Sequence, residues 1–155
     1  MPTRTLKDRI QDDIKDAMRE RAADRLLALR GLMAAIKQRE VDDRTTLDDA
    51  GVVALIDKLV KQRRDSIAAF RQGGRDDLVA KEEAEAALLQ AYLPERLSTD
   101  AVAAEVAMLV SELGATGAAD MGRVMAAAKA RFAGRAEMGA VSAAVKAALA
   151  RSAAP

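Results

Sequence analysis

Pro94, the one proline away from the two ends of the sequence, interrupts a chain in which the apolar residues otherwise follow the spacing of amphipathic helices. One helical pattern runs from Leu78 into the segment Tyr92-Leu93-Pro94. Proline has no backbone N–H and disfavours helical geometry at the residue before it, so this helix must end there. Ser98 can then cap a new helix. The segment Tyr92-Leu93-Pro94 is therefore predicted to join two lobes.

Apolar residues recur every three or four positions on both sides of this joint, and no strand-like alternation appears. We therefore expect an all-α fold, with an N-terminal four-helix lobe over residues 1–94 and a C-terminal three-helix lobe over residues 95–155. The expected helices cover residues 4–22, 24–42, 46–73, 76–92, 98–113, 121–133 and 138–149.

Several helix ends can be predicted from capping residues. Asp24 is expected to cap the second helix, and Thr46 to open a capping box with Asp49 for the third. Gly73-Gly74 is expected to end the third helix and to close an antiparallel hairpin with the fourth. Residues 116–119 are expected to form a loop.

Charged residues interrupt the inner stripes of the third and fourth helices. Arg63 lies on the same stripe as Ile56 and Val60, and Glu85 lies on that of Leu78 and Leu89. An antiparallel hairpin would bring Arg63 close to Glu85, so we predict a structural ion pair that fixes the register of the two helices. A functional acid at this position is disfavoured, because a neighbouring arginine stabilises the ionised carboxylate.

The chain contains neither histidine nor cysteine, which excludes imidazole bases, thiolate nucleophiles and zinc sites built from these residues. No glycine-rich nucleotide loop and no hydrolase motif is present. We therefore predict no catalytic residue, no metal site and no cofactor. The longest uncharged apolar run is too short to span a membrane, and no signal sequence is recognisable, so we expect a cytoplasmic protein without a membrane partner.

Basic residues gather in two zones of a chain whose net charge is only +1. Residues 58–75 hold six basic residues against one acidic residue, and residues 113–155 hold six against two. With only three aromatic residues, at core-like spacing, the chain cannot build a platform that stacks bases. Any RNA contact should therefore be made to phosphates and to folded shape. A solvated charged coat is the simpler interpretation of the composition alone.

Seven blocks of residues follow one another along the chain: Lys61-Gln62-Arg63 with Asp65-Ser66, Gly74-Arg75-Asp76-Asp77-Leu78, Glu82-Glu83-Ala84-Glu85, Tyr92-Leu93-Pro94, Asp120-Met121-Gly122-Arg123-Val124-Met125, Gly134-Arg135-Ala136, and Val141-Ser142 with Val145-Lys146. Together these blocks resemble the GatB/YqeY-like family. The resemblance implies an all-helical protein whose C-terminal lobe is similar to the tail of the B subunit of the glutamine-dependent Asp-tRNA/Glu-tRNA amidotransferase. After Gly134-Arg135-Ala136, where the family usually continues Asp-Gly, this chain has Glu137-Met138-Gly139.

That tail is understood to hold tRNA, while the chemistry takes place elsewhere in the enzyme. The resemblance therefore implies a non-catalytic tRNA-binding or amidotransferase-related accessory protein, in which Arg123, Lys129, Arg135 and Lys146 contact phosphates. Two alternatives stay open. One is an adaptor whose C-terminal lobe docks on a protein partner. The other is a component that supports carbon–nitrogen ligase activity with glutamine as the amido-N-donor, although the sequence supplies no nucleophile for such a reaction in the isolated chain.

Overall fold

The computed structural model describes residues 3–153, which are mostly helical. No strand occurs among these residues, so the predicted all-α class is confirmed. The chain divides into two compact units at the peptide bond between Leu93 and Pro94, inside the predicted joint. Each unit has its own apolar core.

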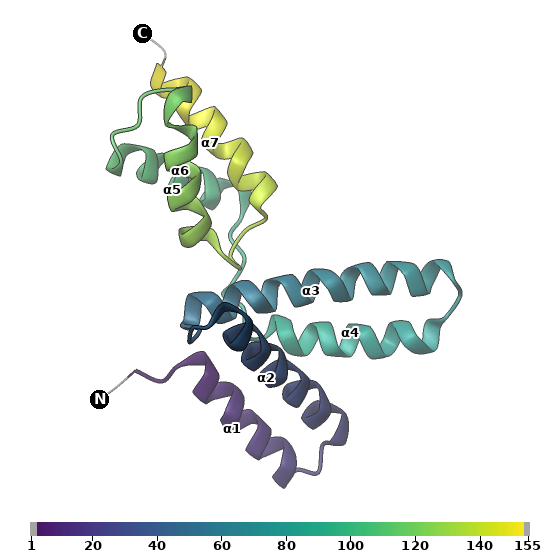
Figure 1. Cartoon of the computed structure of the whole chain (residues 1–155). Helices are drawn as coiled ribbons and strands as arrows, with labels where there is room; N and C mark the ends of the chain where they lie inside the picture. Colours follow the sequence, from purple (N-terminus) through teal and green to yellow (C-terminus); the bar gives the residue numbers. More distant parts are fainter. Residues whose placement is uncertain (1–2, 154–155) are drawn as a thin grey trace. The chain divides into compact units, whose positions relative to one another are not determined.

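The N-terminal unit consists of two helical hairpins (Figure 1). The first pairs α1 (Leu6–Arg19) with α2 (Ala23–Asp43), and the second pairs α3 (Asp49–Gln72) with α4 (Asp76–Gln90). Fully buried aliphatic side chains from three helices fill the core between them: Ile10, Leu29, Ile36, Ile56 and Val60. The helical spacing of these residues explains why the stripes could be recognised in the sequence.

The α3–α4 hairpin closes as predicted at Gly73-Gly74, where Gly74 adopts a left-handed φ of +70°. Within it, Arg63 Nη1 lies 3.1 Å from Glu85 Oε2, which is the pair we predicted, and 3.0 Å from Glu82 Oε2. The Glu85 side chain is 21% exposed and the Glu82 side chain is 14% exposed. The Arg63 guanidinium therefore pairs with two half-buried carboxylates. Its role in fixing the helical register stays a prediction.

Two predicted helix caps and one predicted loop differ from the structure. Asp24 does not cap α2, because Arg21 turns the chain in a left-handed conformation (φ 55°) and Ala22 becomes the N-cap residue. Asp48 caps α3 in place of Thr46, since its carboxylate accepts the Gly51 N–H at 2.8 Å. The last two residues of the expected loop, together with Asp120, form a 3₁₀ turn, η1 (Ala118–Asp120). Conversely, Thr5 and Asp8 form a capping box on α1 that we did not predict.

Tyr92 lies in the joint, after the end of α4 at Gln90, although we expected this tyrosine inside the helix. Its hydroxyl donates a hydrogen bond to Asp13 of α1, and the Arg9 guanidinium lies over its ring, 4.9 Å from the centroid. Burial raises the pKa of Tyr92, and the neighbouring Asp13 carboxylate raises it further. The tyrosine thus anchors the end of the hairpin to α1.

The C-terminal unit packs α5 (Thr99–Glu112), α6 (Met121–Phe132) and α7 (Met138–Ala153) around the fully buried Phe132. Ser98 caps α5 as predicted, by accepting the Ala101 N–H at 3.1 Å. The remaining core side chains are small or aliphatic, as the Ala-rich sequence implies: Val102, Val106, Leu109, Val110, Ala115, Val124, Ala128, Ala136, Val141, Val145, Ala148 and Leu149.

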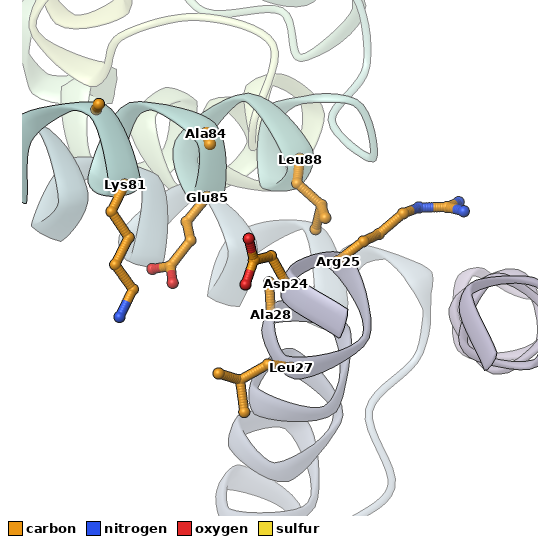
Figure 2. A pocket seen from close by; sticks show the side chains of 9 residues that line it. Asp24, Arg25, Leu27, Ala28, Lys81, Ala84, Glu85 and Leu88 are labelled. Carbon is orange, nitrogen blue, oxygen red and sulfur yellow. The ribbon is translucent and has the colours of Figure 1, made fainter. Parts of the chain in front are cut away.

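A groove opens on the N-terminal unit between α2 and α4 (Figure 2). Its volume is about 640 Å³. Leu27 and Ala28 of α2 face Lys81, Glu85 and Leu88 of α4 across it. Five of its nine lining residues are apolar and four are charged.

Candidate nucleic-acid interface

The four basic residues that we predicted to contact RNA come from α6, α7 and the turn between them. On α6 the buried positions are Val124, Ala128 and Phe132. Arg123 and Lys129 are each adjacent in sequence to one of these core positions, so the helical repeat turns their side chains outward. Lys146 follows the buried Val145 on α7 in the same way. Arg135 lies in the turn after α6.

Arg123 makes two hydrogen bonds within the protein. Its Nη1 donates to the Leu113 carbonyl at 2.7 Å, and its Nη2 donates to Asp120 Oδ1 at 3.1 Å. The other Asp120 oxygen accepts the Thr116 N–H at 2.9 Å. The Thr116 N–H and the Arg123 guanidinium lower the pKa of Asp120. Arg123 therefore supports the loop between α5 and α6, although its side chain is still 52% exposed.

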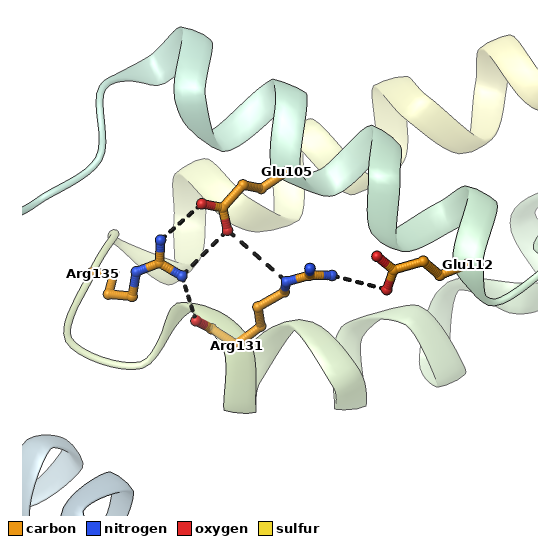
Figure 3. Close-up of polar contacts among 4 residues, drawn as sticks. All are labelled: Glu105, Glu112, Arg131 and Arg135. Carbon is orange, nitrogen blue, oxygen red and sulfur yellow. Dashed lines mark hydrogen bonds and ion pairs between the residues drawn. The ribbon is translucent and has the colours of Figure 1, made fainter.

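Arg135 is committed to a network that ties α5 to the end of α6 (Figure 3). Its two terminal nitrogens reach the two Glu105 carboxylate oxygens at 3.2 and 2.8 Å, and Nη1 also donates to the Arg131 carbonyl at 3.1 Å. Arg131 in turn pairs with Glu112 at 3.1 Å and lies 4.0 Å from Glu105. A bidentate pair of this kind holds the guanidinium in one orientation, so Arg135 has a structural role.

Lys129 and Lys146 are exposed, and they differ from both arginines because neither forms an ion pair within the part of the chain that the structure describes. Both belong to the packed pair α6 and α7. Their ammonium groups remain hydrated and available to an external anion. Of the predicted residues, these two are the best placed for phosphate contacts.

The fold neutralises much of the C-terminal basic zone. Arg123, Arg131 and Arg135 are all paired with carboxylates, and two of those acids, Glu105 and Glu112, lie outside the zone on α5. Counting charges along the sequence could not show this, because Glu105 and Arg135 are 30 residues apart and only the packing of α5 against α6 joins them. The structure brings the four predicted residues into one unit but leaves them with different roles.

Sequence reasoning also missed the cluster of Arg9, Asp13 and Tyr92 in the N-terminal unit. The i, i+4 spacing of Arg9 and Asp13 was a usable signal, because it places both side chains on one face of α1. Nothing local connected that face to Tyr92. Within residues 3–153, no group of three or more candidate ligand side chains is arranged to hold a metal ion, and no helix is long and apolar enough to cross a membrane.

Comparison with known proteins identifies similar chains. The family model described as "Yqey-like protein" matches residues 7–149. A protein of Eremothecium gossypii named "Altered inheritance of mitochondria protein 41, mitochondrial" is 38% identical over 121 residues, which are 76% of this chain and 66% of the relative. The protein of the same name from Lachancea thermotolerans is 36% identical over 107 residues, or 67% of this chain and 57% of the relative.

These curated relatives are longer than the region they share with this chain, which spans between about half and two thirds of their length. They are also named as mitochondrial proteins. Our expectation of a cytoplasmic location is therefore wrong: it depended on the lack of a recognisable signal, and the relatives contradict it.

Proposed function

The chain belongs to the Yqey-like protein family, and from this premise we propose that it is a non-catalytic accessory protein that binds tRNA through its C-terminal unit. The observation that carries the proposal is the exposure of Lys129 and Lys146, without ion-pair partners among the described residues, on two helices that pack together. The similarity of this region to the tRNA-holding tail of the amidotransferase supports the choice of RNA.

The chemistry of the unit favours contacts to phosphates over contacts to bases. Its one aromatic residue, Phe132, is fully buried and cannot stack on a base. Lysine ammonium groups act as point charges that displace counterions from a phosphate backbone. The proposed ligand is therefore a folded RNA recognised by its shape and charge, and binding should weaken steeply with salt.

We expect the four predicted residues to contribute to RNA binding in different ways. Lys129 and Lys146 provide the principal charges. Arg123 is half exposed and adds a phosphate contact through the guanidinium donors that its two internal bonds do not use. Arg135 contributes by holding α6 against α5, since Glu105 occupies both of its terminal nitrogens.

Binding of the full chain to deacylated tRNA, measured over a series of salt concentrations, tests this proposal. Lys129→Ala with Lys146→Ala should weaken binding and reduce the slope of log K against log salt by about two, one for each lost phosphate contact. Lys15→Ala with Lys58→Ala is the matched control, because both lysines are exposed and lie in the N-terminal unit. Equal losses in both double variants, or no binding by the unchanged chain, would contradict the proposal.

An adaptor function is the second candidate, and an exposed apolar side chain favours it. Met108 on the outer face of α5 is 56% exposed, beside the exposed Ala104 and Ala107. A protein partner that covers this face would explain why α5 presents methionine to solvent. Salt-insensitive or absent tRNA binding would favour the adaptor function. Glutamine-dependent turnover by the isolated chain would contradict both candidate functions, because each of them is non-catalytic.

A further inference from the structure

The groove of the N-terminal unit is longer than the α2–α4 contact alone. The hollow between α2 and α4 shares Leu27, Ala28 and Glu85 with a second hollow of about 300 Å³ that extends to Leu59 of α3. Together they follow α2 from Asp24 to Ala35. This length is about three helical turns, enough to seat a helix.

Two residues on the α2 side of the groove have no explanation within the chain. Leu27 is 65% exposed. Gly31 lies in the middle of a 21-residue helix, where glycine costs about 1 kcal/mol relative to alanine. A Cβ added at Gly31 would meet no atom within 4 Å, and its backbone is not left-handed. A glycine at this position permits the backbone of a helix from outside the described residues to approach closely.

We propose that the groove binds α2 of a second copy of this chain, packed antiparallel with Gly31 at the crossing point. With a two-fold axis at Gly31, a residue a given number of positions before Gly31 in one copy lies opposite the residue the same number of positions after Gly31 in the other copy. Leu27 then lies opposite Ala35, so that a protruding side chain meets a small one. Gly31 meets its own copy, which permits close approach of the two helices. The same surface serves both copies, as a two-fold symmetric interface requires.

The charged residues at the groove favour a second copy of this chain over a partner whose surface carries charges of only one sign. Asp24 and Glu85 supply two acidic groups, and Arg25, Lys81 and Arg63 supply three basic groups along the two hollows. A surface that carries charges of both signs can pair with its own copy, whereas a single-sign surface would repel its copy. Asp24 and Lys81 have no ion-pair partner within the described residues, so each is available to a charge on the other copy. This dimer is independent of the proposed RNA contacts, which lie in the other unit.

Sedimentation of the full chain over a range of concentrations tests the dimer, with Gly31→Leu as the first variant. Open space around Gly31 and the higher helix propensity of leucine mean that the variant monomer should keep its helicity. Its bulk should raise the dimer Kd by about tenfold or more, as for a central interface contact. Gly139→Leu is the matched control, since Gly139 is also exposed on a helix, with open space at its Cβ.

A second variant, Leu27→Asp, keeps the proposal falsifiable if Gly31→Leu loses helicity. Leu27 is largely exposed in the monomer, so the variant should keep its stability while the dimer weakens. Weakening by Leu27→Asp and Gly31→Leu, but not by Gly139→Leu, would support the proposal. A chain that stays monomeric at every concentration would overturn it, and so would a dimer that tolerates both groove variants.

Discussion

At the scale of single residues, Tyr92 makes the most testable contribution to stability. Its hydroxyl donates to the Asp13 carboxylate while the ring is 6% exposed. Tyr92→Phe keeps the ring and removes this charge-assisted hydrogen bond, so the free energy of unfolding should fall by about 1–2 kcal/mol at neutral pH. Urea denaturation followed by circular dichroism measures this loss. An unchanged midpoint would show that the hydroxyl contributes nothing.

The same tyrosine should make stability depend on alkaline pH. Its pKa in the folded protein is raised above the ordinary value of 10.0, so the folded state holds the phenol proton more tightly than the unfolded state. The stabilisation is complete below pH 10 and declines as pH rises toward the folded pKa, by up to about 1.4 kcal/mol per pH unit. The unchanged chain should therefore lose more stability than Tyr92→Phe between neutral pH and about pH 11. Parallel losses in the two proteins would contradict the raised pKa.

Arg135 allows structure and RNA binding to be separated at one residue. Arg135→Gln removes both the positive charge and the bidentate contact with Glu105. We expect it to destabilise the C-terminal unit by about 1 kcal/mol and to leave the salt dependence of tRNA binding unchanged. Thermal denaturation and the binding titration, made on the same preparation, check both parts. A reduced salt slope with unchanged stability would assign Arg135 to the RNA instead.

At the scale of helices, the hairpin of α3 and α4 concentrates charge on a packed face. Glu85→Gln leaves Arg63 paired with Glu82, so it should cost only about 0.5–1 kcal/mol. Arg63→Met should cost more, about 1–2 kcal/mol, because it leaves two half-buried carboxylates without their shared partner. Urea denaturation of the two variants ranks these losses. The reverse order would show that the pair does not hold the hairpin in register.

The helices also show how far sequence reasoning reached. Core stripes, the Gly73-Gly74 hairpin, the Ser98 cap and the Arg63–Glu85 pair follow from spacing within or between neighbouring helices, which a sequence displays. The Asp24 cap failed because Arg21 adopts a left-handed conformation that its residue type does not announce. The Glu105–Arg135 contact and the groove depend on packing between helices distant in sequence. The Glu105–Arg135 contact and the other ion pairs of the C-terminal unit decide which of its basic residues remain unpaired, so the candidate site was the less predictable part.

At the scale of the whole molecule, the two cores share no residue: one consists of residues up to Leu93 and the other begins with Leu97. Two separate cores imply that each unit unfolds as its own cooperative transition. The sequence contains one tyrosine, Tyr92, and no tryptophan. Tyr92 lies in the N-terminal core, so tyrosine fluorescence reports the unfolding of that unit alone. Circular dichroism reports both units.

Phe132→Leu uses this difference to test independent folding. It removes the largest buried side chain of the C-terminal core and should lower the stability of that unit by about 1–2 kcal/mol. We expect part of the circular dichroism transition to move to lower urea while the tyrosine transition stays in place. Ile56→Val is the reciprocal control, because Ile56 is fully buried in the N-terminal core and its loss should move the tyrosine transition. If Phe132→Leu shifted both signals equally, the two units would fold as one, and a separate RNA-binding unit would lose its physical basis.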